Sequence, residues 1–322
     1  MSLETESILD RRRLRRKLGW WRSIAIVFAV FALAVAALFS GGSKELLKKS
    51  QIARVTVTGL ITEDRKQLEL LRRLANASHV KGVLVFVNSP GGTTTGAEAL
   101  YNEIRALAKT KPVVAQFGTV AASAAYITGL ATDHIVARSN TITGSVGVIM
   151  QWPELTGLFE KIGVKMNEIK SGPLKAAPSP FEPISPEARQ VTEEMIAEGQ
   201  RWFVGLVQER RKIEPSSVPG LTDGRVYLGR AAVRYKLVDA IGGERAAIDW
   251  MVKKRNVKEG LKVIDWEPEQ DLQWPLAGAI GSYLADILRG TVINLGQAAT
   301  SSDQLGRLGL DGLVSIWHPG KN

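Results

Sequence analysis

The sequence contains no cysteine among its 322 residues and only three histidines. The absence of cysteine excludes thiol catalysis, disulfide bonds and cysteine-ligated metal sites, and it is compatible with an oxidising compartment. The histidines, His79, His134 and His318, are too widely spaced to form a helical pair of metal ligands. The sequence therefore implies neither a metal ion nor an organic cofactor.

Positive charge is concentrated near the start of the chain. The formal charge of the whole chain is +10 at pH 7. Residues 1–22 contain seven Lys and Arg against three Asp and Glu, so +4 lies in a short leader and +6 is spread over the other 300 residues. This distribution argues against nucleic acid as a partner.

One long apolar run follows the leader. The sixteen residues from Ile24 to Phe39 carry no charge, close to the roughly 17–25 mainly apolar residues that a spanning helix needs. We predict a basic cytoplasmic leader over 1–22, a transmembrane anchor over 23–42 and a tether over 43–50. The positive-inside rule then places the rest of the chain on the outer, periplasmic side of a bacterial inner membrane.

Two other interpretations of this run stay open, a buried core helix and a cleaved signal peptide. A core helix is rarely apolar on every face, and the preceding arginine cluster favours a membrane segment. A signal peptide needs small residues at its cleavage site, but Leu38 and Phe39 crowd the small residues Ala36, Ala37 and Ser40. An uncleaved anchor therefore fits best.

Strand-like and helix-like segments alternate after the tether. Strands are expected at 53–61, 82–88, 112–117 and 134–137, and helices at 65–75 and 96–108. This alternation predicts an α/β fold with parallel strands joined by crossover helices. A long amphipathic helix is expected over 186–213. We assign residues 51–257 to one α/β domain and 258–322 to a C-terminal tail.

The C-terminal tail is predicted to be helical. Apolar residues recur at helical spacing within 274–296, while Asp286 and Arg289 argue against a second membrane span. We expect this helix to dock on the domain or on a neighbouring subunit. The alternative is a helix on the membrane surface, anchored by tryptophans such as Trp266 and Trp317.

One serine lies in a run of alanines. In the stretch AASAAY, Ser123 follows a predicted strand and lies near the start of a predicted helix, where unpaired backbone N–H groups stabilise an anion. An earlier strand ends in NSPGG, Asn88–Gly92, a predicted turn whose glycines also expose backbone N–H groups. Two such donors facing each other would form an oxyanion hole for acyl transfer.

Five segments together resemble one protease family. They are NSPGG at 88–92, AASAAY at 121–126, TITGSVGVI at 141–149, KSGPLKAAPSPF at 170–181 and GRVYLGRAAVRYKLVD at 224–239. In content and order they are similar to signal peptide peptidase A, a family of membrane-bound serine proteases in the Clp-protease/crotonase superfamily. The resemblance covers roughly residues 55–247 and implies an α/β fold of repeated ββα units.

The resemblance implies a Ser–Lys mechanism, with Ser123 as nucleophile, Lys175 as general base and Ser145 positioning the lysine. Ser–Lys pairs are a known variant of the catalytic triad. A lysine accepts a proton only after its surroundings have removed its charge. Lys175 lies in the apolar stretch GPLKAAPSP without an adjacent carboxylate, whereas Lys170 follows Glu168 and is expected to be a solvated surface charge.

The resemblance also implies the oxyanion donors, the backbone N–H groups of Ala124 and of Gly91 or Gly92, with Gly92 preferred. Members of the family often have glycines where this chain has Ala124 and Ala125, so a turn with positive φ would be strained there. The family ending GLVD is KLVD here, with Lys236 in place of glycine. Neither change alters a side chain of the chemistry.

Two alternative functions follow from the same residues. The first is a Ser-His-Asp site as in Clp protease, for which His134 lies only eleven residues after Ser123 and is more consistent with packing or capping. The second is a non-catalytic crotonase-like scaffold or an acyl-CoA enzyme that uses only the two backbone donors. Covalent labelling of Ser123 by a serine-reactive probe separates the protease from the second alternative.

The resemblance implies peptide substrates, namely signal peptides left in the membrane, and a homo-oligomer with active sites shared between subunits. Four prolines between Ser171 and Ile184 predict a stiff, extended loop around Lys175. Such a loop reaches a neighbouring molecule as readily as its own domain. The apolar stripe of the helix over 186–213 offers an interface for cyclic assembly.

Overall fold

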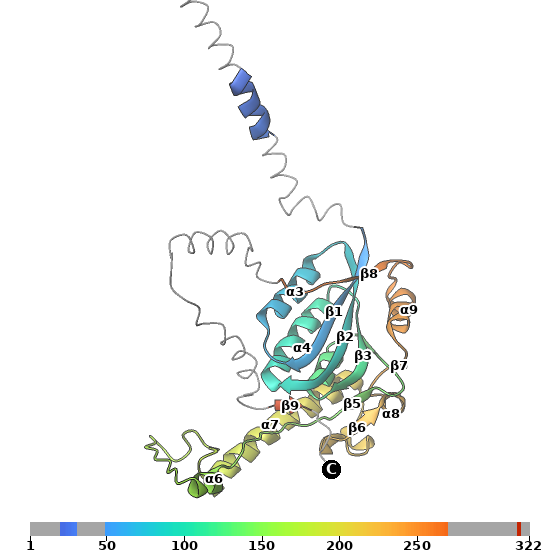
Figure 1. Ribbon diagram of the computed structural model, residues 1–322. Coiled ribbons are helices and arrows are strands. Elements are labelled where there is room, and N and C mark those ends of the chain that lie inside the picture. Colours follow the sequence, from blue (N-terminus) through green and yellow to red (C-terminus); the bar gives the residue numbers. More distant parts are fainter. Residues whose placement is uncertain (1–19, 31–48, 270–313, 317–322) are drawn as a thin grey trace, which may run out of the picture. The chain divides into compact units, whose positions relative to one another are not determined.

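The computed structural model describes residues 20–30, 49–269 and 314–316 (Figure 1). Residues 20–30 form a helix. Within these described ranges, no helix is long and apolar enough to cross a membrane. Residues 31–42 of the expected anchor, and most of the expected C-terminal tail, lie outside the described ranges. The transmembrane helix therefore stays a prediction.

The residues from 51 onward build a sheet around parallel central strands. The strands are β1 Gln51–Ile61, β2 Val80–Thr93, β3 Val113–Ala122, β4 His134–Ala137, β5 Ile142–Gly144, β6 Val226–Leu228, β7 Ala240–Ile241, β8 Lys262–Asp265 and β9 Val314–Ile316. The main path is β6-β5-β3-β2-β1-β8, while β4 pairs with β3 and β7, and β9 pairs with β2. Among the described strands, every pairing is parallel except β5–β6 and β2–β9.

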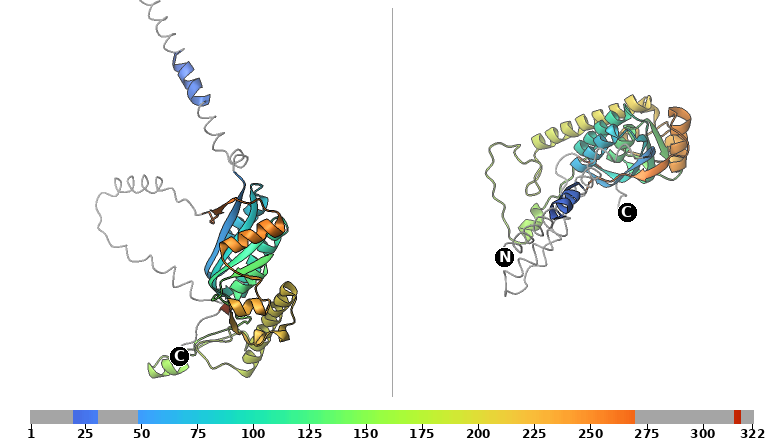
Figure 2. Two further views of the ribbon diagram at one scale, coloured as in Figure 1. Left: turned by 90° about the vertical axis from the view of Figure 1, so that its right-hand side faces the viewer. Right: turned by 90° about the horizontal axis from the view of Figure 1, so that it is seen from above.

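Helices cover both faces of this sheet. Their bounds are α3 Arg65–Asn76, α4 Thr94–Ala108, α5 Ala124–Leu130, α6 Thr156–Lys161, α7 Pro186–Arg211, α8 Gly229–Arg234 and α9 Glu244–Arg255, with short 3₁₀ turns at Pro215–Ser217 and Leu221–Asp223. On one face α4 packs against both α3 and α5, and on the other face α9 contacts β2, β3 and β4 (Figures 1 and 2). The predicted alternation of parallel strands and crossover helices is confirmed.

The run VLVFV in β2 is continuously apolar because both faces of this strand are buried. Val83, Leu84 and Val85 are all 0% exposed, as expected for a central parallel strand. On the face covered by α9, Leu84 belongs to a core cluster with Ile52 of β1 and Met251 of α9. The central strands therefore supply the core of the domain, and the candidate site lies at the ends of these strands.

Three segments differ from the sequence expectation. NSPGG is not a turn, because β2 continues through it to Thr93 and pairs with the last residues of β1. β3 extends beyond Phe117 to Ala122, directly before Ser123. The tail, which was assigned outside the domain, contributes two strands to the sheet, β8 and β9, while the helix expected within 274–296 lies outside the described residues. Glycine and proline favour turns locally, but neighbouring strands supply backbone partners that a local pattern does not reveal.

The chain between β5 and α7 projects from the sheet, and we term residues 150–185 the arm (Figures 1 and 2). The predicted long helix is confirmed as α7, which begins where the Ser185 hydroxyl accepts the Ala188 N–H. Arg210, in the last turn, donates to two backbone carbonyls at and just after the end of α5. By contrast, Val191 and Met195 near the first turns are 40% and 44% exposed.

Candidate active site

Ser123 lies at a sharp turn between β3 and α5. Its φ is 61° and its ψ is −125°, a conformation that costs a residue other than glycine roughly 1–3 kcal/mol and that concentrates at functional sites. The residue is 1% exposed, and its N–H donates to the Gly144 carbonyl at 2.8 Å. The strain considered for Ala124 and Ala125 therefore falls on the serine itself, because both alanines are helical.

Ser145 leaves the neighbouring strand at the same edge of the sheet. β3 and β5 are parallel, and Ala122 lies opposite Gly144, so the residues that follow them leave adjacent strands. Ser145 also has a positive φ, 51°, and its N–H donates to the Arg225 carbonyl at 2.9 Å. It is 9% exposed. Strand pairing thus brings together Ser123 and Ser145 from two separate motifs.

The glycines of NSPGG are required for two different reasons. Gly91 has a φ of 124°, which favours glycine. At Gly92 a Cβ would lie 1.9 Å from the Ile61 carbonyl oxygen, so the close approach of β1 requires glycine there. The Gly91 N–H already donates to the Ser89 hydroxyl at 3.1 Å. This hydrogen bond favours Gly92 over Gly91 as the candidate oxyanion donor.

Asn88 holds the end of β3 beside β2, a role that the sequence did not reveal. The register between the two strands shifts here, and β3 bulges. The Asn88 Oδ1 accepts the N–H groups of Thr119 at 2.9 Å and Val120 at 3.2 Å, which satisfies backbone donors that the bulge frees from the ladder. Asn88 therefore fixes the segment that leads into Ser123. An asparagine beside a strand end was the only local signal.

β9 occupies the edge of β2 next to this turn. Gly91, Gly92 and Thr93 pair in antiparallel fashion with Val314–Ile316. At Gly91 and Gly92 the other side of β2 is taken by β1, so β9 lies on the side of β3. β9 also contacts α5. The glycine strand therefore accepts an extended segment in antiparallel orientation beside the turn that carries Ser123.

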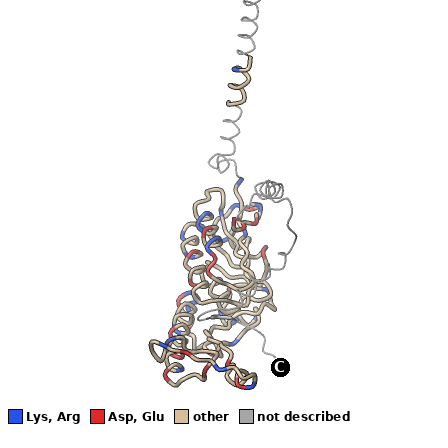
Figure 3. The backbone as a smooth tube through the Cα atoms, turned by 60° about the vertical axis from the view of Figure 1, so that its left-hand side comes forward, with Lys and Arg blue, Asp and Glu red and all other residues tan. Residues whose placement is uncertain are grey.

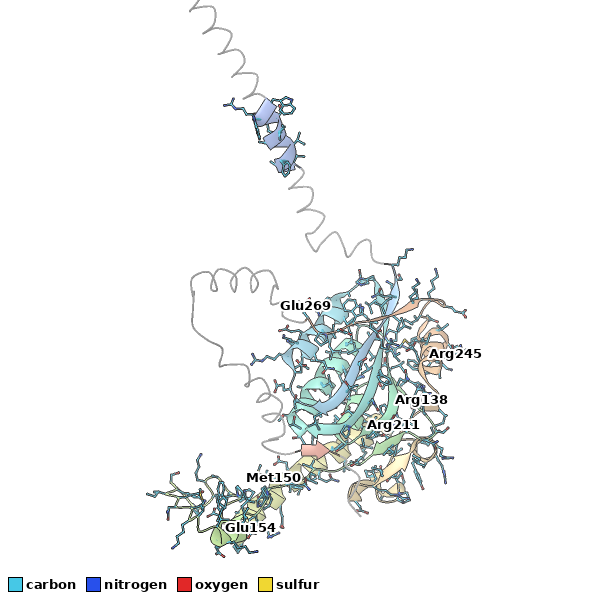
Figure 4. All side chains as sticks on the ribbon, viewed as in Figure 1. Arg138, Met150, Glu154, Arg211, Arg245 and Glu269 are labelled. Atoms are coloured by element: carbon cyan, nitrogen blue, oxygen red, sulfur yellow. The ribbon has the colours of Figure 1, made fainter. Side chains whose placement is uncertain are left out.

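Lys175 lies in the arm and is exposed, whereas Ser123 and Ser145 are buried. Met150 and Glu154 mark where the arm leaves the sheet toward α6 (Figure 4). Within the described part of the chain, the Lys175 side chain takes part in no ion pair. One chain therefore brings the two serines together but leaves the lysine in a separate, projecting segment.

The arm has its own internal contacts. The Leu155 N–H donates to the Pro180 carbonyl at 2.8 Å, and the rings of Phe159 and Phe181 stack with centroids 5.6 Å apart. Lys170 forms ion pairs with two glutamates and is the surface charge that the sequence predicted. The large apolar side chains that the arm leaves exposed are Leu158, Ile162, Val164, Met166, Ile169 and Leu174.

Known proteins match this chain over most of its length. A protein of Methanocaldococcus jannaschii, named as a candidate protease, is 31% identical over 287 residues, which cover 83% of this chain and 91% of that protein. The model of peptidase family S49 matches residues 105–258, and the model of the Clp protease family matches residues 44–145. The chain belongs to peptidase family S49.

Two further relatives agree with this S49 assignment. A candidate signal peptide peptidase SppA of Enterococcus faecium is 31% identical, covering 81% of this chain and 77% of that protein. Protease 4 of Haemophilus influenzae is 32% identical over 68% of this chain, which spans only 37% of that longer protein. The resemblance to signal peptide peptidase A is confirmed, and the fold is a mixed α/β sheet similar to that of Clp-like proteases.

The KLVD segment of this S49 domain contains a structural ion pair. The Asp239 carboxylate accepts the Ile135 N–H at 2.7 Å and forms two hydrogen bonds with Arg211, at 2.7 and 3.1 Å. Burial works to raise the pKa of Asp239, but the hydrogen bonds and charge of Arg211 outweigh it and lower the pKa below 3.8. Asp239 thus joins the end of α7 to β4. Lys236, which replaces the family's glycine, has a φ of 60°.

His134 lies at the wrong end of β3 to act on Ser123. It pairs with Val114, and the nine residues from there to Ser123 span roughly 30 Å of strand. Its ring stacks on Trp250 with centroids 4.7 Å apart, and burial lowers its pKa. His134 is therefore a packing residue, and the Ser-His-Asp alternative that used it is wrong for this chain.

Proposed function

We propose that this S49 member is a serine endopeptidase in which Ser123 is the nucleophile and Lys175 is the general base. The observation that carries the proposal is the backbone of Ser123, which is buried, has a positive φ and precedes a helix. A serine that only filled space would not need a strained turn. A nucleophile does, because the strand-to-helix turn presents its hydroxyl at the end of the sheet.

The proposed reaction has two halves. The Ser123 Oγ bonds to the substrate carbonyl carbon while its proton passes to the neutral Lys175 Nζ. That proton then goes to the departing amine nitrogen as the peptide C–N bond breaks, which leaves an ester on Ser123. Water attacks the ester with the same lysine as base, and the peptide carboxylate is released. The Ser145 hydroxyl accepts a hydrogen bond from the amine and orients its lone pair.

Backbone donors stabilise the oxyanion in this proposal. Ala124 is the first residue of α5, so its N–H has no acceptor within the helix. The second donor is the N–H of Gly92 on β2, which is preferred because the Gly91 N–H already donates to Ser89. Removing one oxyanion donor typically costs about 10²–10³ in kcat.

The base reaches the nucleophile across a subunit boundary in this proposal. Two features support that arrangement. The arm is held together by its own contacts yet projects with its apolar side chains exposed, as a segment that docks on a partner would. Lys175 lies in this arm and is solvated within a single chain. Burial against a neighbouring subunit would desolvate the lysine, which disfavours its charged form.

We further propose that the substrates are extended apolar peptides, including cleaved signal peptides. The antiparallel pairing of β9 supports a peptide bound as an added strand on Gly91–Thr93, where backbone hydrogen bonds hold it beside Ser123. The predicted anchor over 23–42 would hold the domain on the outer side of a bacterial inner membrane. That location suits peptides left in the bilayer after secretion.

The experiment mixes two inactive variants, Ser123→Ala and Lys175→Ala, dissociates them and reassembles them together. If each site takes its serine from one subunit and its lysine from the next, about one quarter of the sites in an equal mixture are intact in a cyclic assembly. Hydrolysis of a fluorogenic apolar peptide should therefore return to about that fraction of wild type.

The controls are each variant put through the same cycle alone, and fluorescence energy transfer between labelled subunits to prove exchange. An inactive mixture despite proven exchange would contradict the shared site while leaving the Ser–Lys chemistry open. Full activity of either single variant would remove that residue from the mechanism. A serine-reactive probe that fails to label Ser123 in the intact wild-type assembly would favour the scaffold alternative.

A further inference from the structure

The amino-terminal edge of the parallel sheet gathers the ends of several elements. β1, β2 and β8 begin there in register, with Gln51 opposite both Val80 and Lys262. α9 ends at the same edge, because a Cβ on Gly82 would meet the Met251 sulfur at 2.8 Å. The turn between α4 and β3 lies beside them. This edge is opposite the one from which Ser123 emerges.

Eight basic residues belong to these ends, and we term them the basic edge. They are Lys81, Lys109, Lys111, Lys253, Lys254, Arg255, Lys258 and Lys262. All are exposed except Lys111, which is partly exposed. Two acidic residues, Asp133 and Glu259, lie among them, and Asp133 pairs with Arg255 at 3.2 Å.

The basic edge accounts for the positive charge of the domain. Residues 51–269 contain 29 Lys and Arg against 24 Asp and Glu, a net charge of +5. Without the basic edge and its two acidic residues, 21 basic and 22 acidic residues remain, a net charge of −1. Elsewhere on the domain, basic and acidic positions are intermixed along the helices (Figure 3). The positive excess therefore lies on one edge.

Local structure explains only part of this cluster. Basic residues in the last turn of α9 and just after α4 complement the negative ends of these helices. Lys81, Lys258 and Lys262 have no such role, because they lie at strand starts or in the loop before β8. Within the described part of the chain, no ion pair is made by Lys109, Lys253, Lys254, Lys258 or Lys262. These five lysines are thus left to interact with an external anion.

We infer that the basic edge docks on an anionic lipid surface. Two arguments select lipid as the partner. First, β1 begins at this edge, and the eight-residue tether that precedes it spans at most about 28 Å from the end of the predicted anchor. Second, the predicted topology places the domain outside the cytoplasm, where phospholipid headgroups are the adjoining anionic surface. Lysines close to such a surface are attracted to it within about a Debye length.

Docking in this orientation sets the height of the candidate nucleophile. Ser123 follows the far end of β3, whose ten residues span roughly 33 Å. A domain docked by its basic edge therefore holds Ser123 on the side turned away from the lipid. The inference is independent of the catalytic proposal, because it uses no residue of the Ser–Lys site.

The test uses single-cysteine labelling, which is clean because the chain has no native cysteine. The full chain carries an environment-sensitive fluorophore through Thr110→Cys, beside the basic edge, or through Thr222→Cys, in the 3₁₀ turn before β6. Each protein is added to vesicles of phosphatidylcholine alone or with about 30% phosphatidylglycerol, both containing a headgroup nitroxide quencher. Peptide hydrolysis is measured in the same samples, so catalytic failure and docking failure are read separately.

We expect phosphatidylglycerol to increase quenching at position 110 about twofold and to leave position 222 unchanged. About 0.5 M salt should reverse the increase, because the Debye length falls to about 4 Å. The reversal variant Lys254→Glu/Lys258→Glu should abolish it, while the matched pair Lys161→Glu/Lys165→Glu on the arm should not. If the chain does not insert into neutral vesicles, stronger quenching at position 110 than at position 222 on anionic vesicles still reports docking.

Equal quenching at position 110 on neutral and anionic vesicles would overturn the inference. So would loss of the effect in both reversal variants, because net charge alone would then explain it. If anionic vesicles have no effect while duplex DNA changes the fluorescence at position 110 but not at 222, the partner is nucleic acid and the lipid assignment is wrong.

Discussion

The end of β3 and the arm differ in almost every physical respect. Around Ser123 and Ser145 the residues are buried, the backbone is strained and hydrogen bonds come from four segments of the chain. Around Lys175 the residues are exposed, and the contacts are confined to the arm. The first region is complete within one chain, whereas the second has unused apolar surface. One part of the proposed site thus has a rigid backbone geometry, and the other has exposed apolar surface.

The largest expected effect tests whether both regions serve one reaction. We expect Ser123→Ala and Lys175→Ala each to lower kcat/KM for an apolar peptide at least about 10³-fold, and the double variant to lose no more than either one. Residues that act as a unit are not additive. Steady-state hydrolysis and thermal melts check this, with the exposed Ser216→Ala as control. An additive double variant would show that the two regions act separately.

The same glycine substitution should behave differently in the two regions. In Gly92→Ala the new Cβ would meet the Ile61 carbonyl at 1.9 Å, so we expect the free energy of unfolding to fall by about 3 kcal/mol or more. In Gly157→Ala, on α6 of the arm, nothing lies within 4 Å, and better helix propensity should add about 0.5–1 kcal/mol locally. Urea denaturation measures both. Similar losses of unfolding free energy in Gly92→Ala and Gly157→Ala would contradict the expected difference between the two regions.

Replacing a carboxylate by an amide should lower the free energy of unfolding more in the domain than in the arm, but the difference should be smaller than for the glycine substitutions. Asp239→Asn removes the charged partner of Arg211, whose side chain is only 11% exposed, and should cost roughly 2–3 kcal/mol. Glu182→Gln, which breaks an arm ion pair with Lys170, should cost at most about 1 kcal/mol because Glu182 is 47% exposed. Chemical denaturation of both variants at neutral pH measures the difference.

The contribution of the Asp239–Arg211 pair to stability should also appear in the acid unfolding of the wild-type protein. The folded pKa of Asp239 is below its ordinary value of 3.8, so the unfolded chain binds the proton more readily. The stability from this pair is fully present above about pH 4 and is lost as pH falls through the lower folded pKa. Asp239→Asn should therefore flatten the fall in stability below pH 4. An unchanged acid profile in Asp239→Asn would remove the pair as its cause.

The smallest effect on the fold is expected from the exposed apolar side chains of the arm and of the first half of α7. Ile169 is fully exposed and Met195 is 44% exposed, so Ile169→Ser/Met195→Ser should change the stability of an isolated subunit by less than about 0.5 kcal/mol. If these side chains are covered in an assembly, the same variant should dissociate at higher protein concentration. Analytical ultracentrifugation measures this dissociation, and an unchanged assembly would exclude these side chains from the interface.

The sequence predicted what is encoded locally. β-branched runs identified the first four strands, and a long amphipathic pattern identified α7, because each signal lies within its own segment. The adjacency of Ser123 and Ser145 depends on the pairing of β3 with β5, and no local pattern reports that register. The role of Asn88 likewise exists only beside the bulge of β3. NSPGG was misread as a turn, because its glycines serve the close approach of β1.

Because β9 pairs with β2, it occupies the same strand edge that a peptide substrate is proposed to bind. A peptide that adds to Gly91–Thr93 must first displace Val314–Ile316. Both partners belong to one chain, so dilution of the enzyme does not weaken this competition. Backbone hydrogen bonds alone then give an incoming peptide no advantage, and side chains that fit the neighbouring surface decide entry. In the proposed binding mode, β9 would thereby set an affinity threshold that poorly fitting peptides do not pass.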